Sequence, residues 1–301
     1  MNKPFERVAV VGTGVLGTQI AMVSAYAGYE VSVYDTREGS FDEAYAKLYA
    51  DLKAKGVNPF IPWDKWEECK KSIRFATSLR DALKDVDLAV EAITEDLEIK
   101  REVFKQMGQN APARAIFATN SSSLPVSRME DSSGRPERCI NTHFYQPLEG
   151  MTMADLMAGT KTPPEVMQKG EEWIRSLNLV PLLVKKEALG FCFNSVWRAV
   201  KKQTLHMWAN SIVEFRDIDR AWIIFTGMKI GPFALMDTVG LDTVFNIEMV
   251  YYNESKDPGD KPPDALAEKV QKGELGVKSG KGFYTYPNPE FLDPGFLNPK
   301  K

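Results

Sequence analysis

A glycine fingerprint between two apolar segments limits the fold of this chain more than any other feature of its sequence. Gly12, Gly14 and Gly17 follow the apolar run 7–11 and precede a segment with helical character. Asp35 stands at the end of the next apolar run, 18 residues after Gly17. In a strand–turn–helix unit, Gly12 permits the tight turn, Gly14 lets a pyrophosphate approach the backbone, and Gly17 lets the helix pack on the strand. Free N–H groups at the start of the helix favour phosphate. The pattern predicts a dinucleotide-binding βαβ unit.

The residues that follow favour NAD as the dinucleotide. The Asp35 carboxylate accepts hydrogen bonds from ribose hydroxyls and repels a 2′-phosphate. Arg37 argues weakly for NADP, because a guanidinium pairs with a 2′-phosphate. FAD uses the same fingerprint, but no other segment indicates a flavin. We therefore expect NAD as the cofactor, bound by the three glycines and Asp35.

Strand and helix patterns alternate up to residue 184, which predicts parallel βαβ units. Ser78 is the expected N-cap of one short helix. Predicted strands cover 7–11, 31–34, 73–75, 86–93, 115–119, 138–143, 151–157 and 180–184, and predicted helices cover 15–27, 40–55, 78–84 and 97–107. Beyond this point the predicted elements are helices, over 191–214, 218–226 and 233–252. We therefore predict an α/β protein with an N-terminal Rossmann-type doubly wound sheet in residues 1–186 and a smaller all-helical domain in residues 187–301.

The composition excludes several classes of protein. A formal net charge of -3 supplies no basic field for nucleic acid. No apolar run reaches the 18 residues of a membrane-spanning helix, and the N-terminal residues do not have the pattern of a signal peptide. Cys69, Cys139 and Cys192 show no zinc-ligand or CxxC spacing. We therefore expect a cytoplasmic chain without a metal site, whose thiols are reduced and buried.

The chain contains two histidines, and one of them lies where α/β folds bind ligands. His143 ends a predicted strand, at the carboxyl edge of the sheet. A histidine suits proton exchange with an alcohol near neutral pH, although a strand-end histidine can also be purely structural. His206 lies inside an amphipathic helix, where we expect a packing role. His143 is therefore the candidate for acid–base chemistry.

Oxidation of an alcohol without a metal needs a base, a partner that orients the base, and donors for the substrate oxygen. Glu149 and Asp155 are the candidate partners of His143. The turn 120–123 (NSSS) offers hydroxyl and amide donors, or else caps a short helix. Asn194 offers a further donor, or else makes a polar contact between helices.

Two acidic residues lie at the end of the fourth predicted strand. Glu91 stands within an apolar strand, where it is either functional or a buried carboxylate with satisfied hydrogen bonds. Glu95 follows it, where a charge at the start of a helix is the simpler interpretation. The sequence contains neither an HExxH motif nor a cluster of metal ligands.

Several segments, in the order in which they occur, resemble those of the 3-hydroxyacyl-CoA dehydrogenases over almost the whole chain. Each segment alone is a modest match, and the ordered set is specific. The segments are the glycine fingerprint with Asp35, 90–100 (VEAITEDLEIK), 118–124 (ATNSSSL), 135–147 (RPERCINTHFYQP), 190–194 (GFCFN), 231–242 (GPFALMDTVGLD) and 276–284 (GVKSGKGFY).

The resemblance implies a role for each matching residue. His143 matches the catalytic histidine of the family. Asp155, twelve residues later, takes the place of its partner carboxylate, which is usually Glu. Ser122 and Asn194 match residues that contact the substrate oxygen and the thioester region. Cofactor contacts are implied for Glu95, Lys100, Asn120 and Lys278.

The resemblance also implies the substrate and the assembly. It implies hydride transfer between the C3 hydroxyl of a 3-hydroxyacyl-CoA and NAD, as in fatty acid metabolism, and a homodimer formed through the helical domain. Two residues within the implied site depart from the family: Asp155 replaces the usual Glu, and Gln146 replaces the usual Asn. Both changes put the usual acyl chain of the substrate in question. The segment after Asp35 is shorter than the CoA-binding hairpin of the family. The lysines there that are candidates for CoA phosphates are Lys47, Lys53, Lys55, Lys70 and Lys71.

Two other functions fit the same fold. One is NAD-dependent oxidation of a free hydroxy acid, such as carnitine or a sugar acid. The other is a non-catalytic dinucleotide-binding or structural protein, since one fold serves many functions. Such a protein would have no use for His143, Ser122 and Asn194 together.

Overall fold

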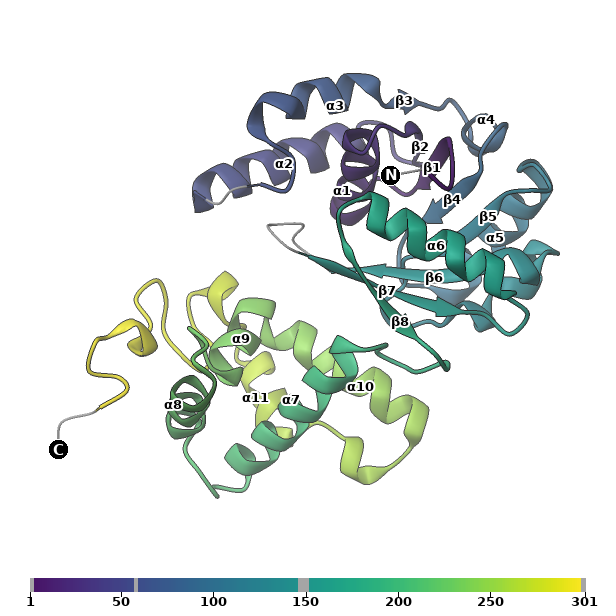
Figure 1. Cartoon of the computed structure of the whole chain (residues 1–301). Helices are drawn as coiled ribbons and strands as arrows, with labels where there is room; N and C mark the ends of the chain where they lie inside the picture. The colour runs from purple at the N-terminus through teal and green to yellow at the C-terminus, as the bar shows by residue number, and fades with distance from the viewer. Residues whose placement is uncertain (1–2, 57–58, 146–151, 299–301) are drawn as a thin grey trace. The chain divides into compact units, whose positions relative to one another are not determined.

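The computed structural model describes residues 3–56, 59–145 and 152–298 of the chain (Figure 1). The chain divides into two compact units, Met1–Cys192 and Phe193–Lys301. The boundary predicted from the sequence lies six residues earlier, between residues 186 and 187. In the described ranges, no helix is long and apolar enough to cross a membrane.

An eight-stranded sheet forms the centre of the first unit (Figure 1). The strands lie in the order β3-β2-β1-β4-β5-β6-β7-β8, and the first six follow the order of a doubly wound dinucleotide-binding fold. The predicted α/β architecture is therefore confirmed. The strands are β1 (Arg7–Val11), β2 (Glu30–Tyr34), β3 (Arg74–Phe75), β4 (Leu88–Glu91), β5 (Ile116–Thr119), β6 (Cys139–Phe144), β7 (Met153–Ala158) and β8 (Val180–Val184).

Strand β7 runs antiparallel to β6, whereas every other neighbouring pair in the sheet is parallel. The expectation of parallel units throughout is therefore wrong at this strand. Only eight residues separate Phe144 from Met153, and a parallel pair needs a crossover connection of about a dozen residues or more. A connection of this length therefore suits the antiparallel pairing of β7 with β6.

Helices cover both faces of this sheet, because its strands are apolar on both sides. In β1, Val8 and Val10 belong to one core cluster and Ala9 and Val11 to the other, as the alternation of side chains along a strand requires. The first cluster includes residues of α1, α2, α3 and α6, and the second includes residues of α4 and α5. The sequence analysis does not predict α3 or α6. The helices are α1 (Val15–Tyr26), α2 (Ser40–Lys55), α3 (Trp66–Ser72), α4 (Leu79–Leu83), α5 (Leu97–Asn110) and α6 (Pro164–Ser176).

Side-chain caps fix the start of two of these helices. The Ser78 hydroxyl accepts a hydrogen bond from Asp81 N at 3.1 Å, which confirms the predicted cap of α4. The Asp96 carboxylate accepts a hydrogen bond from Ile99 N at 3.0 Å and caps α5 in the same way. This cap sets the first turn of α5, where Lys100 follows.

The second unit is helical, as predicted, but one predicted helix is in fact two. The segment 233–252 is divided between α9 (Pro232–Val239) and α10 (Leu241–Ser255) by Gly240. The φ of Gly240 is 100°, which a helix cannot contain. The other helices are α7 (Phe193–Ala209), α8 (Phe215–Thr226) and α11 (Asp264–Gln271). Among the described residues of both units, short 3-10 helices are Trp63–Lys65, Val126–Arg128, Glu130–Ser133, Pro136–Arg138, Pro258–Asp260, Val277–Ser279 and Glu290–Leu292.

Two buried carboxylates hold parts of the second unit together. Asp219 on α8 accepts hydrogen bonds from the first turn of α9, at Phe233 N (2.8 Å) and Ala234 N (3.0 Å). It also accepts one from the Tyr284 hydroxyl at 3.0 Å. Asp237 on α9 accepts a hydrogen bond from Tyr284 N at 2.9 Å. Burial raises the pKa of Asp219 to about 6, although its hydrogen bonds oppose the shift. The two carboxylates tie α8, α9 and the loop that carries Tyr284 into one structure.

We expect replacement of Asp219 by asparagine to destabilise the fold. Asparagine keeps the size of the side chain but offers one acceptor oxygen in place of two, and its NH₂ group then faces buried donors. A buried donor without an acceptor costs roughly 1–3 kcal/mol. Asp219→Asn should lower the free energy of unfolding by that amount in urea denaturation. Asp293→Asn, at an exposed side chain, is the control, and equal stabilities of the two variants would contradict this account.

Candidate active site

The loop between β1 and α1 has the backbone that the glycine fingerprint predicts. Gly12 has a φ of 94°, in the left-handed region that favours glycine. A Cβ at Gly17 would lie 1.9 Å from the carbonyl oxygen of Gly12, so no larger residue fits there. A Cβ at Gly14 would have no neighbour within 4 Å, and no side chain caps α1 at this residue. The first N–H groups of α1 are therefore left for an anion.

The Asp35 carboxylate is held against this loop at the end of β2. Its Oδ2 accepts hydrogen bonds from Thr13 N at 2.6 Å and from the Thr13 hydroxyl at 3.1 Å. Its Oδ1 accepts one from Arg37 N at 2.9 Å. The Arg37 side chain pairs with Glu43 at 2.6 Å on the surface. The structure thus brings Asp35 to the glycine loop. The Arg37 guanidinium is already paired with the Glu43 carboxylate.

A cavity of about 1030 Å³ opens beside the glycine loop. Asp35 contributes to its polar lining, and Ile93, Ile99 and Val103 contribute to its apolar lining. Ligand and cofactor sites are likewise concave and largely apolar, with a few placed polar groups. The cavity is therefore a candidate binding site beside the glycine loop.

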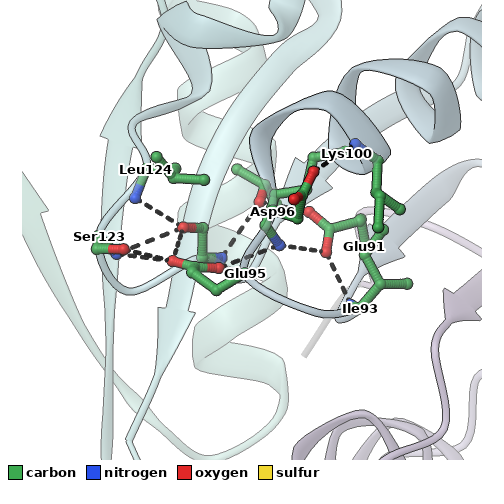
Figure 2. A network of polar contacts seen from close by, with 10 residues as sticks. Glu91, Ile93, Glu95, Asp96, Lys100, Ser123 and Leu124 are labelled. Atoms are coloured by element: carbon green, nitrogen blue, oxygen red, sulfur yellow. Dashed lines mark hydrogen bonds and ion pairs between the residues drawn. The ribbon is translucent and has the colours of Figure 1, made fainter. Parts of the chain in front are cut away.

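Three charged side chains form a compact network at the carboxyl end of β4 (Figure 2). Lys100 is 1% exposed, and its Nζ lies 2.7 Å from Glu91 Oε1 and 3.2 Å from Glu95 Oε2. Glu91 is fully buried and also accepts hydrogen bonds from Ile93 N at 2.8 Å and the Thr119 hydroxyl at 2.7 Å. The interpretation of Glu91 as a satisfied buried carboxylate is therefore confirmed. A direct contact between Lys100 and the cofactor stays a prediction.

Glu95 links this network to the serine turn that follows β5 (Figure 2). Its Oε1 accepts hydrogen bonds from the Ser121 hydroxyl, from the Ser123 hydroxyl at 2.7 Å and from Ser123 N at 3.1 Å. Burial alone would raise the pKa of Glu95, but Lys100 and the two serine hydroxyls outweigh it and hold that pKa below its usual value. Glu95 thus fixes the serine turn through Ser121 and Ser123. Ser122, which lies between these two serines, is exposed.

The antiparallel register of β6 and β7 places His143 directly opposite Asp155. Directly opposed residues project from the same face of a sheet and lie within reach of one another. His143 Nδ1 lies 3.1 Å from Asp155 Oδ2, and the exposed fractions of the two residues are 6% and 0%. When Nδ1–H donates to the carboxylate, the lone pair of the neutral ring is on Nε2. The pair therefore has the arrangement of a general base and the carboxylate that orients it.

Aromatic side chains enclose this pair, and the sequence analysis does not predict them. The ring of Phe191 stacks on His143, with centroids 5.3 Å apart and an interplanar angle of 12°. The Tyr145 ring contacts His143 edge-on at 4.6 Å, and its hydroxyl donates to Asp155 Oδ2 at 2.5 Å. Tyr145 directly follows the last residue of β6 and stands two positions after His143 in the sequence. This closeness to a strand-end histidine is the sequence pattern that could have identified Tyr145.

Other predicted site residues are placed as follows. Asn120 is buried, and its Oδ1 accepts a hydrogen bond from Phe144 N at 3.0 Å, beside His143 in the chain. Asn194, in the first turn of α7, is half-buried. Lys278 pairs with Asp242 at 2.6 Å. These last two belong to the second unit, and their roles stay predictions. Gln146 and Glu149 lie outside the described residues.

Two expectations from the sequence are wrong. Cys192 is exposed, whereas Cys69 and Cys139 are buried as expected. His206 is exposed and therefore does not have the expected packing role. Its Nδ1 lies 3.2 Å from Nδ2 of Asn210, which follows one turn later in the chain. Cys192 and His206 lie outside the apolar cores that periodicity predicts. Within the described part of the chain, no group of three His, Cys, Asp or Glu side chains could hold a metal ion.

Comparison with known proteins gives a family for each unit. The family model for 3-hydroxyacyl-CoA dehydrogenase, NAD binding domain, matches residues 7–188, and the model for 3-hydroxyacyl-CoA dehydrogenase, C-terminal domain, matches residues 190–286. The 3-hydroxybutyryl-CoA dehydrogenase of Clostridioides difficile is 31% identical over 285 residues, which cover 93% of this chain and 99% of that protein.

Solved structures give the same result. The (S)-3-hydroxybutyryl-CoA dehydrogenase of Ralstonia eutropha has a TM-score of 0.83 and 26% identity, over 94% of this chain and all of that one. A diketoreductase that acts on dicarbonyl compounds has a TM-score of 0.83 and 33% identity, over 95% of this chain and all of that one. The similarity to all three proteins therefore extends over both units.

The buried network gives a prediction about stability. Lys100→Met leaves the Glu91 carboxylate buried without its cation, and loss of one partner from a buried pair costs roughly 3–5 kcal/mol. We expect that loss in urea denaturation, and we expect the Glu91→Gln, Lys100→Met double variant to recover most of it. Lys105→Met, which removes an exposed 3.8 Å contact with Glu102 on the same helix, is the control. A Lys100→Met variant as stable as the control would show that the pair is not needed.

Proposed function

The chain belongs to the 3-hydroxyacyl-CoA dehydrogenase family, and from this premise we propose that it transfers a hydride between C3 of a 3-hydroxyacyl-CoA and NAD. The observation that carries the proposal is the buried pair of His143 and Asp155, with Nδ1 and Oδ2 3.1 Å apart. This pair belongs to the same compact unit as the glycine loop. A dinucleotide-binding protein without catalytic activity would not need it.

The residues of the first unit fit NAD. The open space at Gly14 and the uncapped start of α1 suit a pyrophosphate. Asp35, already fixed by Thr13, has the charge and the position to accept hydrogen bonds from the adenosine ribose. When bound, NAD supplies the hydride acceptor. We propose Glu95, Lys100 and Asn120 as further residues of this site; the first two also hold each other by their ion pair. Lys278 is proposed with them.

His143 is the proposed general base in oxidation and general acid in reduction. Its Nε2 takes the proton of the C3 hydroxyl, while Asp155 holds the Nδ1–H tautomer and stabilises the imidazolium that forms. The two aromatic rings that contact His143 limit its rotation. We propose that Ser122 and Asn194 donate hydrogen bonds to the substrate oxygen, as their positions in the family motifs imply.

The CoA portion of the substrate is proposed to meet the lysines after Asp35. Two of the five candidates are already engaged: Lys53 lies 3.9 Å from the centre of the Trp63 ring, and Lys70 pairs with Asp42 at 2.7 Å. Lys47 and Lys71 are exposed. These two are therefore better placed to bind phosphate without losing an existing contact.

The proposed reaction is tested by oxidation of NADH with acetoacetyl-CoA, followed by the loss of NADH absorbance. We expect turnover with the thioester and loss of about 10²–10⁴-fold in kcat for His143→Ala, the contribution typical of a general acid–base group. NADH binding should be retained. His206→Ala removes the other histidine of the chain and should retain full activity.

Free acetoacetate and a simple diketone are run beside the thioester. Turnover of the free compounds alone would replace the proposal by the NADH-dependent reduction of a free keto acid, the reverse of hydroxy acid oxidation, or of a diketone. The similarity to a diketoreductase favours the diketone as the alternative. NADH binding without turnover of any of these compounds would favour a binding protein. Full activity of His143→Ala would overturn the assigned base.

We further propose that the second unit forms a homodimer, as the family implies. Several of its large apolar side chains are exposed, and Phe225 on α8 is 93% exposed; exposed apolar surface of this kind marks interfaces. Phe225→Ser should shift the chain toward the monomer in analytical ultracentrifugation. Phe75→Ser, at a phenylalanine of the first unit that is 50% exposed, should not. A monomeric unmodified chain would refute the dimer. The cytoplasmic location stays a prediction.

A further inference from the structure

One oxygen of Asp155 receives two hydrogen bonds, from different kinds of donor. His143 Nδ1 lies 3.1 Å from Oδ2, and the Tyr145 hydroxyl donates to the same Oδ2 at 2.5 Å. The other oxygen, Oδ1, accepts a hydrogen bond from Cys192 N at 3.3 Å. A hydroxyl this close to a carboxylate makes a strong, charge-assisted bond. Three contacts, from His143, Tyr145 and Cys192, therefore fix the orientation of the carboxylate.

We propose that Tyr145 is a positioning residue for His143, acting through Asp155. This inference rests on the proposed function, because it assigns Tyr145 a role in the proton transfer that His143 performs. The phenol fixes the rotation of the carboxylate, so that Oδ2 stays aimed at the imidazole. It also takes up part of the negative charge of Oδ2, which weakens the hold of Asp155 on a protonated His143.

The freedom of the Asp155 carboxylate to rotate explains why such a residue is useful. Asp155 is paired directly with His143 across the β6–β7 ladder, and one methylene carries its carboxylate. Rotation of that carboxylate about a single bond would otherwise turn Oδ2 away from Nδ1, since this torsion has a broad, two-fold potential. The Tyr145 hydroxyl donates to Oδ2 and Cys192 N donates to Oδ1, and these two hydrogen bonds together restrict the rotation of the carboxylate.

The same contact places Tyr145 against the ring of His143. The two ring centroids are 4.6 Å apart with an interplanar angle of 67°, while Phe191 stacks on the ring at 12°. In these contacts, the titratable side chains are Tyr145, Asp155 and His143, and Cys192 contributes its backbone N–H. Tyr145 contacts both members of the pair and is therefore placed to affect the strength of the base.

The test compares Tyr145→Phe with Tyr29→Phe. Tyr29 is buried, and its phenylalanine variant also loses a hydroxyl contact, at 2.6 Å to Ser176. Tyr29 precedes β2 at the amino edge of the sheet, opposite to the edge where His143 lies. For Tyr145→Phe we expect kcat to fall about tenfold, the size of one charge-assisted hydrogen bond. The acidic limb of kcat/KM for hydroxyacyl-CoA oxidation should move to higher pH, because the carboxylate then holds the proton on His143 more strongly. The KM for NAD should not change.

A double variant tests the geometric part of the proposal. Asp155→Glu adds one methylene, and Tyr145→Phe removes one oxygen, so the combination nearly conserves volume. We expect each single variant to lose activity and the double variant to regain most of it, because the longer carboxylate reaches His143 without the phenol. Losses that simply add in the double variant would overturn the proposal.

A measurement without substrate separates this inference from the proposed function. The chain has two histidines, so ¹⁵N-histidine labelling with His206→Gln leaves the imidazole signals of His143 alone. Tyr145→Phe should change the ¹⁵N shifts that report the Nδ1–H tautomer, and Tyr29→Phe should not. If these shifts change while acetoacetyl-CoA is not turned over, the proposed function fails and the positioning role stands. If turnover is normal and both tyrosine variants match the unmodified chain in shifts and pH profile, the positioning role is wrong.

Discussion

The ion pair between Glu91 and Lys100 is the interaction on which the carboxyl edge of the sheet depends. It joins the last residue of β4 to the first turn of α5 inside the core. A lone charge at this depth would be unstable, so each residue requires the other. The same ammonium group holds Glu95, and Glu95 holds the serine turn after β5. Contacts that begin in the core thus position the turn that carries Ser122.

The acid–base pair depends on a different constraint, the one antiparallel step in the sheet. Parallel strands reach the carboxyl edge together, whereas β7 starts where β6 ends. Asp155 therefore meets His143 across the ladder, although twelve residues separate them in the chain. A shift of register by one residue would turn one of the two side chains to the other face of the sheet. Backbone hydrogen bonds, which are insensitive to side-chain chemistry, thus fix the geometry of the site.

Local patterns of the sequence predict the glycine loop, Asp35 and most strands, because these depend on neighbours in the chain. His143 is identified as a candidate because it ends a strand. Non-local contacts are beyond such patterns. The apolar strand around Glu91 indicates that it is buried, but nothing in the sequence reveals that Lys100 is buried with it, and the hydrogen bond between Tyr145 and Asp155 depends on how distant segments pair. Gly240 is a special case. The apolar pattern continues through it, so only the backbone conformation shows that the helix ends there.

The exposed thiol of Cys192 provides a chemical handle on the site. Burial raises the pKa of the Cys139 thiol to about 12 and also raises that of Cys69, so both stay protonated and shielded from reagents. A maleimide fluorophore would then attach at Cys192 alone, on the residue whose backbone N–H binds Asp155. The chain therefore carries a built-in labelling position for optical studies of ligand binding, with no engineered cysteine required.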